Sequence, residues 1–339
     1  MVLALAMVAG SLVGQGGCRP NPPVIGGENY FVSATGICFS PDGQRVAFAG
    51  KRIRPDSAGR QVHWLNAATG KFQGSAPVYA VQLAWLPTGA ELITAGPSGL
   101  VRVDTRTRTV SAPIPAGANA WYGLGVDQSG QVIVGLRLLA EWDGRTACPQ
   151  VFSMDGSQSP KVVGECSASR NAHSLAVAGN HSPTLAAISF QEETAVEVWV
   201  VPPPNSRASS APEFVLPTSG PCQLAFAADG ERLAVLSAKG LEVFRIADSK
   251  VTREWQSDNT GPPGDAQRPT LAISGNGRTV VAARKDELLV FRDGRASQSV
   301  KLRSTPWELA VDNKGRRVAV VNSSRGTVSV IELAAERVR

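Results

Sequence analysis

Side chains suited to acid–base or metal chemistry are few in this 339-residue chain, and they do not cluster. The histidines number three, and none has the spacing to another ligand that is typical of a zinc or metalloprotease site. No glycine-rich loop precedes a predicted helix, and no serine nucleophile motif is present. We therefore predict no catalytic, metal or cofactor site. His63 is assigned to a surface or groove position of a strand, and His181 to a solvated turn.

Aspartates recur in register with glycines instead of gathering at one place. Asp42 and Asp229 stand one residue before a glycine, and Asp127 and Asp312 stand three residues before one. Short acidic side chains commonly hydrogen-bond the backbone of tight turns. Their repetition therefore favours turn geometry over catalysis or calcium binding.

The cysteines allow one disulfide. Cys148 and Cys166 flank a segment that reads as strand, turn, strand, and residue 157, midway between them, falls in the turn. Residues equidistant from a hairpin turn can face each other across the ladder, and in an oxidising compartment such a pair can form a disulfide. The alternative is two free buried thiols. Cys38 and Cys222 are read as small core residues.

The N-terminus has the character of an export signal. Residues 1–13 are apolar and uncharged, and they are shorter than the roughly 20 residues that span a bilayer as a helix. Gly16, Gly17 and Cys18 resemble the lipobox of bacterial lipoproteins, although Gln15 stands where that family usually has leucine. The resemblance implies a signal peptide over residues 1–17, a lipidated Cys18 and a tether over 18–23. Ordinary secretion, a retained anchor and a cytoplasmic protein are the alternatives.

A repeated phrase organises the remaining sequence. Leu224–Gly230 reads LAFAADG and Ile37–Gly43 reads ICFSPDG, with an aliphatic residue six positions before the glycine and an apolar one four before it. A degraded copy begins at Leu175. The copies lie about 45 residues apart on average. Apart from the degraded copy, the copies have their turn glycines at Gly43, Gly89, Gly130, Gly230, Gly277 and Gly315.

Each copy continues with a third strand, a turn and a short fourth strand, and period-two alternation dominates throughout. Four strands in 40–50 residues are typical of a β-propeller blade. The residues FSPDG at Phe39–Gly43 resemble the first turn of WD40 and YVTN-type repeats, and Trp64–Lys71 is similar to the end of their third strand. The sequence departs from eukaryotic WD40 repeats because a Trp-Asp pair occurs only at Trp142–Asp143.

The repeats and the resemblance predict an all-β fold over residues 24–339. This is a seven-bladed β-propeller of four-stranded antiparallel blades, closed by an N-terminal strand from Pro23–Phe31. Closure would remove the open edge that a linear stack of sheets leaves.

The charge balance is mildly basic, with a net charge of +6 and a pI near 9.3. It permits anionic partners. No basic run with interleaved aromatics is present, so we expect no specific nucleic-acid binding. We expect a monomer.

The resemblance also implies a partner-binding face. In that family the loops before the first strands and between the second and third strands surround the channel mouth. Aromatic residues and cations fall at these positions. The predicted partner-binding residues are Tyr122, His173, Trp307, Trp121, Lys51, Arg52, Arg284, Lys285 and Arg325. The alternative is that the aromatics only plug the channel.

From these features we expect a non-enzymatic protein-binding scaffold on a membrane-anchored lipoprotein of the cell envelope, with a protein partner at the channel mouth. One alternative is a channel-site enzyme of the lactonase type, and another is a component of an outer-membrane assembly machinery. Lys71, Arg106 and Arg108 are expected on the opposite face.

Overall fold

The computed structural model describes the chain in segments: residues 30–31, 36–52, 61–113, 120–127, 130, 132–141, 144–153, 161–162, 172–178, 183–190, 193–201, 211–247, 250–260, 270–322 and 327–334. Within these segments no helix has the length and apolar character needed to cross a membrane. Residues 1–29, with the predicted signal, Cys18 and tether, lie outside them.

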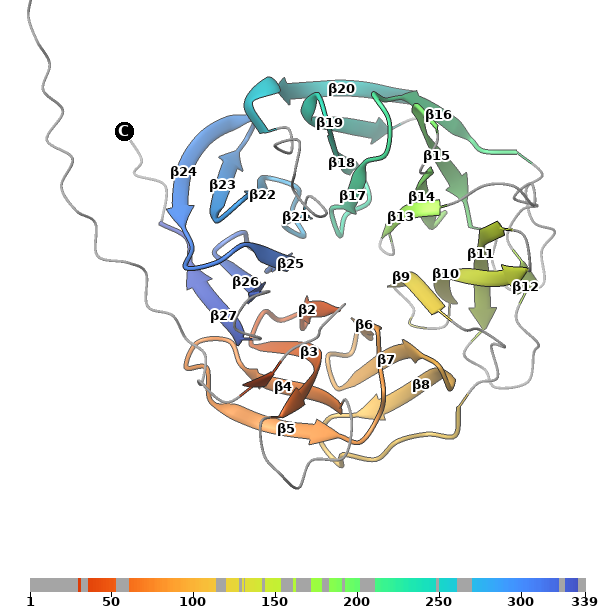
Figure 1. Cartoon of the computed structure of the whole chain (residues 1–339), viewed down its shortest axis with the longest axis vertical. Helices are drawn as coiled ribbons and strands as arrows, with labels where there is room; N and C mark the ends of the chain where they lie inside the picture. The colour runs from red at the N-terminus through yellow and green to blue at the C-terminus, as the bar shows by residue number, and fades with distance from the viewer. Residues whose placement is uncertain are drawn as a thin grey trace, which may run out of the picture.

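Antiparallel sheets follow one another around a ring (Figure 1). The first sheet contains β1 (Tyr30–Phe31), β2 (Ile37–Phe39), β3 (Arg45–Arg52), β4 (Gln61–Asn66) and β5 (Phe72–Ala76). Next come β6 (Gln82–Trp85), β7 (Glu91–Gly96) and β8 (Gly99–Asp104). They are followed by β9 (Ala120–Val126), β10 (Val132–Glu141), β11 (Gly144–Ser153) and β12 (Lys161–Val162).

The second half of the ring continues the same order. It contains β13 (Ala172–Ala178), β14 (Leu185–Phe190), β15 (Ala195–Val200) and β16 (Phe214–Pro217). It then has β17 (Gln223–Phe226), β18 (Arg232–Ser237), β19 (Gly240–Ala247), β20 (Lys250–Ser257) and the 3₁₀ helix η1 (Asp258–Thr260). The last strands are β21 (Leu271–Ile273), β22 (Thr279–Arg284), β23 (Glu287–Arg292), β24 (Arg295–Lys301), β25 (Pro306–Val311), β26 (Arg317–Asn322) and β27 (Thr327–Glu332). The strands nearest the centre of the ring are β2, β6, β9, β13, β17, β21 and β25 (Figure 1).

The all-β propeller with antiparallel blades is confirmed, but the predicted ring of seven four-stranded blades closed by an N-terminal strand is wrong. Among the described strands, six sheets are simple meanders, and two of these, β6–β8 and β25–β27, have three strands. The first sheet is different, because β1 and β2 both pair with β3. β1, which comes from the predicted closing segment, thus pairs Tyr30 with Arg52 and does not extend the sheet of β27.

An irregular segment replaces a fourth strand beside β8. The Asp104 amide donates to the Thr109 carbonyl at 3.0 Å and the Ser111 amide to the Arg102 carbonyl at 2.9 Å, but only Val103 and Val110 form a bridge. The chain reverses through Arg108 at a φ of 61°, a left-handed conformation that L-residues rarely adopt. This turn prevents a regular ladder.

Contacts of the last sheet with the first close the ring. One hydrophobic cluster joins Val46 and Phe48 of β3 to Val321 of β26 and Val330 of β27. The Asn313 side-chain amide also donates to the Pro41 carbonyl at 2.6 Å. Among the described residues, packing and polar side chains bring the ends of the ring together.

The repeated glycines form the turns that the sequence predicts. Gly43 and Gly315 have φ values of 70° and 65°, and the Gly43 amide donates to the Ser40 carbonyl at 2.8 Å. Glycine tolerates this conformation because it lacks a Cβ. Asp42 accepts the Gln44 amide at 2.9 Å, so the recurring aspartate is a turn residue as expected.

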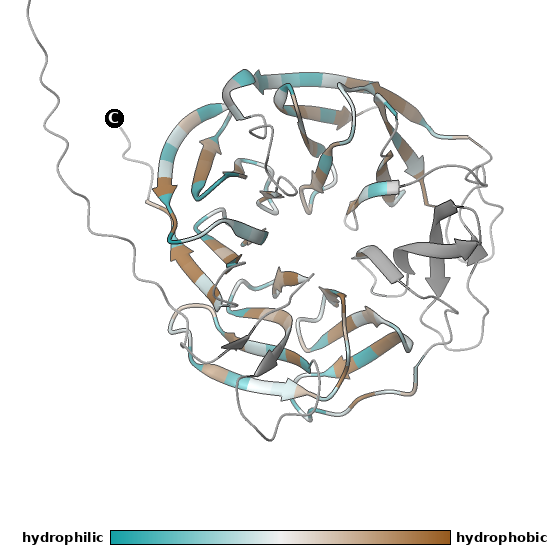
Figure 2. Cartoon of the chain, in the orientation of Figure 1, coloured by the Kyte–Doolittle hydropathy of each residue, from teal (hydrophilic) through white to brown (hydrophobic). Residues whose placement is uncertain are grey.

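The core lies between neighbouring sheets. Figure 2 shows hydrophobic residues along the inner and middle strands, whereas β20 and β24, at the outer rim, carry many hydrophilic ones. Trp64 of β4 packs with Leu83, Trp85 and Leu92 of the next sheet in one buried cluster. These contacts hold adjacent blades at fixed positions and so fix the grooves between them.

Candidate functional site

The two ends of the meanders define two faces of the propeller. The turns between second and third strands and the starts of the innermost strands lie at one end, which we call the channel-mouth face. The turns between first and second strands, and those between third and fourth strands, lie at the other end, the opposite face. Antiparallel order places them so because each strand reverses the chain.

The predicted aromatic residues lie on separate parts of the channel-mouth face. Trp307 is the second residue of β25 and is 42% exposed. Trp121 and Tyr122 lie in β9, and His173 lies in the neighbouring strand β13, with its Nε2 3.0 Å from Nε2 of Gln223. β25 lies across the ring from β9 and β13 (Figure 1). The structure therefore brings His173 near the strand that carries Trp121 and Tyr122, and it places Trp307 on the other side of the ring.

The predicted cations are spread over two sheets. Lys51 and Arg52 end β3, where they pair with β1. Arg284 ends β22, and Lys285 follows at a φ of 52° in the tight turn to β23. Asp286 in this turn accepts a hydrogen bond from Lys301 at 2.7 Å, which lowers the pKa of the carboxyl. Arg325 lies outside the described residues.

A second feature of the channel-mouth face is a pocket of about 290 Å³ beside the β18–β19 turn. Lys239 and Asp258 line it together with Arg253 and Glu242, which form an ion pair at 2.9 Å. The pocket carries charges of both signs and is open to solvent, as is typical of the polar rim of a protein interface.

The described part of the chain does not test the predicted disulfide. Cys148 lies in β11 opposite Arg137, and Cys166 lies outside the described residues. β11 pairs Gln150 with Val162, so the hairpin is symmetric about residue 156, one residue from the midpoint of the two cysteines.

Two residues assigned from the sequence are buried in the structure. Cys222 is a core residue as predicted, and burial raises the pKa of its thiol to about 11. His63, predicted at the surface or in a groove, is 1% exposed, with its ring 5.4 Å from that of Phe48, so this prediction is wrong. His181 lies outside the described residues. No group of three His, Cys, Asp or Glu side chains suited to a metal ion occurs in the described segments.

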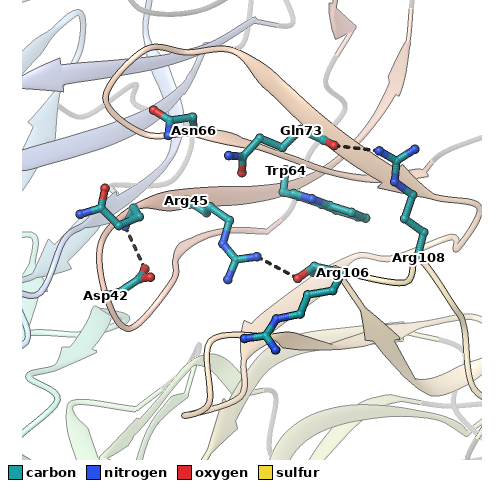
Figure 3. A pocket seen from close by; sticks show the side chains of 9 residues that line it. Asp42, Arg45, Trp64, Asn66, Gln73, Arg106 and Arg108 are labelled. Atoms are coloured by element: carbon teal, nitrogen blue, oxygen red, sulfur yellow. Dashed lines mark hydrogen bonds between the residues drawn. The ribbon is translucent and has the colours of Figure 1, made fainter.

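The sequence did not predict the larger cavity, an open groove of about 580 Å³ on the opposite face, between the first two sheets. We call it the arginine groove (Figure 3). Its lining residues are Asp42, Gln44, Arg45, Trp64, Asn66, Gln73, Thr105, Arg106 and Arg108.

Arg45 forms the floor of the arginine groove. Its Nη1 donates to Oγ1 of Thr105 at 2.9 Å, its Nη2 donates to the Gly89 carbonyl, and its guanidinium lies 4.6 Å from the ring centroid of Trp85. Oγ1 of Thr105 in turn donates to the Ala90 carbonyl at 2.6 Å. Arg45 therefore joins the two blades and holds a positive charge in place.

The turn after β8 forms one wall of the groove. Asp104 accepts the Arg106 amide at 2.7 Å and the Thr107 amide at 3.0 Å, and these bonds lower the pKa of its carboxyl. Nη2 of Arg108 donates across the groove to the Gln73 carbonyl of β5 at 3.1 Å. Figure 3 shows the hydrogen bonds from Arg45 to Thr105 and from Arg108 to Gln73, and it shows none from the Arg106 side chain.

Asp42 is the one carboxylate in this lining, against three guanidinium groups. Desolvation raises its pKa, but hydrogen bonds from Ser40 and the Gln44 amide and the charge of Arg45 outweigh it, so the pKa is lowered. The groove therefore carries a net positive charge at neutral pH and is suited to an anionic ligand.

Comparisons with solved structures agree with the propeller. The β-propeller domain of Cps50 (Swd1) from Myceliophteria thermophila superposes with a TM-score of 0.67 at 13% sequence identity, over 90% of this chain and 98% of that one. Kuenenia stuttgartiensis hydrazine synthase gives a TM-score of 0.66 at 15% identity, over 98% and 100%. No protein-family model and no curated protein matches the sequence. At such identities the similarity shows the fold alone.

Proposed function

We propose that this β-propeller is a non-enzymatic binding module that captures a protein partner on its channel-mouth face. The observation that carries the proposal is the exposure of Trp307, 42%, at the start of an innermost strand. At the same repeat position Cys222 is fully buried and Val81 is partly buried. Trp307 is thus more exposed than the residues at the equivalent position of these two other copies.

A large exposed aromatic side chain on a rigid strand has the properties of an interface anchor. Burying the exposed indole surface against a partner is favourable by roughly 25 cal/mol per Å², and tryptophan is enriched among residues that dominate binding energy. Lys285 and the polar pocket at Lys239 lie on the same face and would form a solvated rim. Because the scaffold is packed from both sides, little ordering would be needed on binding.

Alanine substitution of Trp307 tests the proposal. We expect Trp307→Ala to reduce the amount of partner captured from an envelope extract by about tenfold, the size of effect typical of an anchor residue, with an unchanged Tm. Val215→Ala is the matched control, because Val215 is 58% exposed on the outer strand β16. Equal capture by wild type and Trp307→Ala would contradict the proposal.

We further propose that the propeller is anchored to a membrane of the cell envelope through a lipid on Cys18. Gly16-Gly17-Cys18 and the preceding apolar run support this. Buried acyl chains contribute roughly 0.8 kcal/mol per CH₂, so two or more chains hold a protein at a bilayer. Wild type should incorporate radioactive palmitate and Cys18→Ala should not. Label retained by Cys18→Ala would exclude Cys18 as the attachment site.

A further inference from the structure

We propose that the arginine groove binds the carboxylate side chains of an extended acidic peptide. The groove lies on the opposite face, so this is a second binding surface, independent of the partner site at the channel mouth. The proposal rests on the placement of three guanidinium groups, two of them fixed by hydrogen bonds, around an open cavity of about 580 Å³.

The bonding of Arg106 differs from that of most other arginines in the described part of the chain. Several arginines on the sheet surfaces pair with carboxylates. The Arg106 side chain makes no hydrogen bond or ion pair with any described residue, and it lines the groove. It is therefore available to a ligand. The paired arginines include Arg102 with Glu91, Arg232 with Glu254, Arg253 with Glu242 and Arg278 with Asp293.

The backbone holds Arg106 and Arg108 in position without help from a ligand. Asp104 fixes both the Arg106 and the Thr107 amides, and Arg108 adopts a left-handed φ of 61° that costs an L-residue roughly 1–2 kcal/mol. This turn directs the Arg108 side chain back to the Gln73 carbonyl. The cationic wall is thus pre-organised, which lowers the entropic cost of binding.

The other lining groups suit a peptide. Guanidinium groups bind carboxylates through paired, charge-assisted hydrogen bonds. The side-chain amides of Gln44 and Gln73 can each donate to and accept from a peptide unit, and neither makes a side-chain hydrogen bond with a described residue. The groove opens to solvent along the blade boundary, so an extended chain can enter it.

The same lining disfavours a phosphate polymer. The Asp42 carboxylate stays ionised beside the arginines and repels closely spaced phosphates. Trp64 is only 2% exposed, so the groove offers no aromatic surface on which a base could stack. A peptide carboxylate carries one charge and pairs with one guanidinium group, so Asp42 weakens its binding without preventing it.

The test is fluorescence anisotropy of a labelled hexaglutamate peptide with the full-length protein at low and moderate salt. We expect binding that weakens with salt, as charge pairing requires. Arg106→Gln alone should weaken binding several-fold, and Arg106→Gln with Arg108→Gln by about tenfold. Arg295→Gln is the matched control, since it also removes an exposed charge, on β24 and outside the groove lining.

Asp42→Asn should change the peptide affinity in the opposite direction to the arginine substitutions. It keeps the turn, because asparagine retains an oxygen acceptor for the Gln44 amide. It should tighten peptide binding. Equal weakening by Arg295→Gln and Arg106→Gln would overturn the proposal, since it would show attraction to overall charge. Displacement of the peptide by inorganic pyrophosphate at concentrations below the peptide Kd would overturn it too, since it would identify a phosphate site.

Discussion

The absence of a side chain at Gly74 decides how tightly the first sheet packs. A Cβ at this position would lie 2.5 Å from Cζ2 and 2.7 Å from Cε2 of Trp64, far inside van der Waals contact. Trp64 is 2% exposed and belongs to the cluster shared with the second sheet. Gly74 therefore allows the indole to lie against β5, beside the arginine groove.

We expect Gly74→Ala to lower the free energy of unfolding by about 1–3 kcal/mol, the usual cost of overpacking a core. Urea denaturation monitored by tryptophan fluorescence measures it. The double-mutant cycle with Trp64→Phe separates this clash from other effects, because phenylalanine lacks the atoms that the new methyl meets. A cost that is equal in both backgrounds would mean that Trp64 is not the cause.

At the same scale, the sequence predicted the turn residues but not the groove. Gly43 and Asp42 act within one hairpin, so local pattern was sufficient to assign them. The floor of the groove depends on Arg45 meeting Thr105, which is 60 residues away in the next blade. That contact depends on how the two sheets pack, and no residue spacing in the sequence predicts it. His63 was misassigned because a polar residue in a strand can also lie between aromatic rings.

Among the elements, a repeated arginine connects successive blades. Arg45 and Arg317 each stand two residues after a turn glycine and donate to the carbonyl of the turn glycine in the next sheet, Gly89 and Gly43 respectively. The Arg317 bond, 3.5 Å long, crosses from the last sheet to the first. The repeat thus places an arginine hydrogen bond at these two junctions, one of which closes the ring.

Asn313 makes the shorter polar contact at that closing junction. We expect Asn313→Ala to lower the free energy of unfolding by about 1 kcal/mol, because the hydrogen bond to the Pro41 carbonyl is lost. Chemical denaturation gives the value. Lys314→Ala, at the exposed neighbouring position, is the control and should leave stability unchanged. Equal stability of Asn313→Ala and wild type would show that this hydrogen bond does not stabilise the closed ring.

The closure also explains where the sequence-based fold prediction failed. The strand pattern is local and predicted the meanders and their turns, but which edge a short N-terminal strand joins depends on competing partners. β1 pairs with the end of β3 at Lys51 and Arg52, beyond the part of β3 that β2 covers. A hydrophobic cluster joins the first and last sheets without pairing β1 to the edge of β27.

For the whole molecule, the propeller separates two surfaces of different chemistry. The channel-mouth face presents an exposed indole with mixed charges around it, and the opposite face presents a groove of fixed arginines. Rigid blades lie between them, so changes at one face should leave the other unaltered. We therefore expect Trp307→Ala to bind hexaglutamate with the same affinity as the wild type.

The proposed function is tested most directly by a photocrosslinking amino acid incorporated at position 307 and, separately, at position 215, in cells that express the full chain. The account predicts a discrete protein adduct from position 307 and none from position 215, because only the first lies on the channel-mouth face. Adducts from position 215 with none from position 307 would contradict it and place the partner on the outer rim of the propeller.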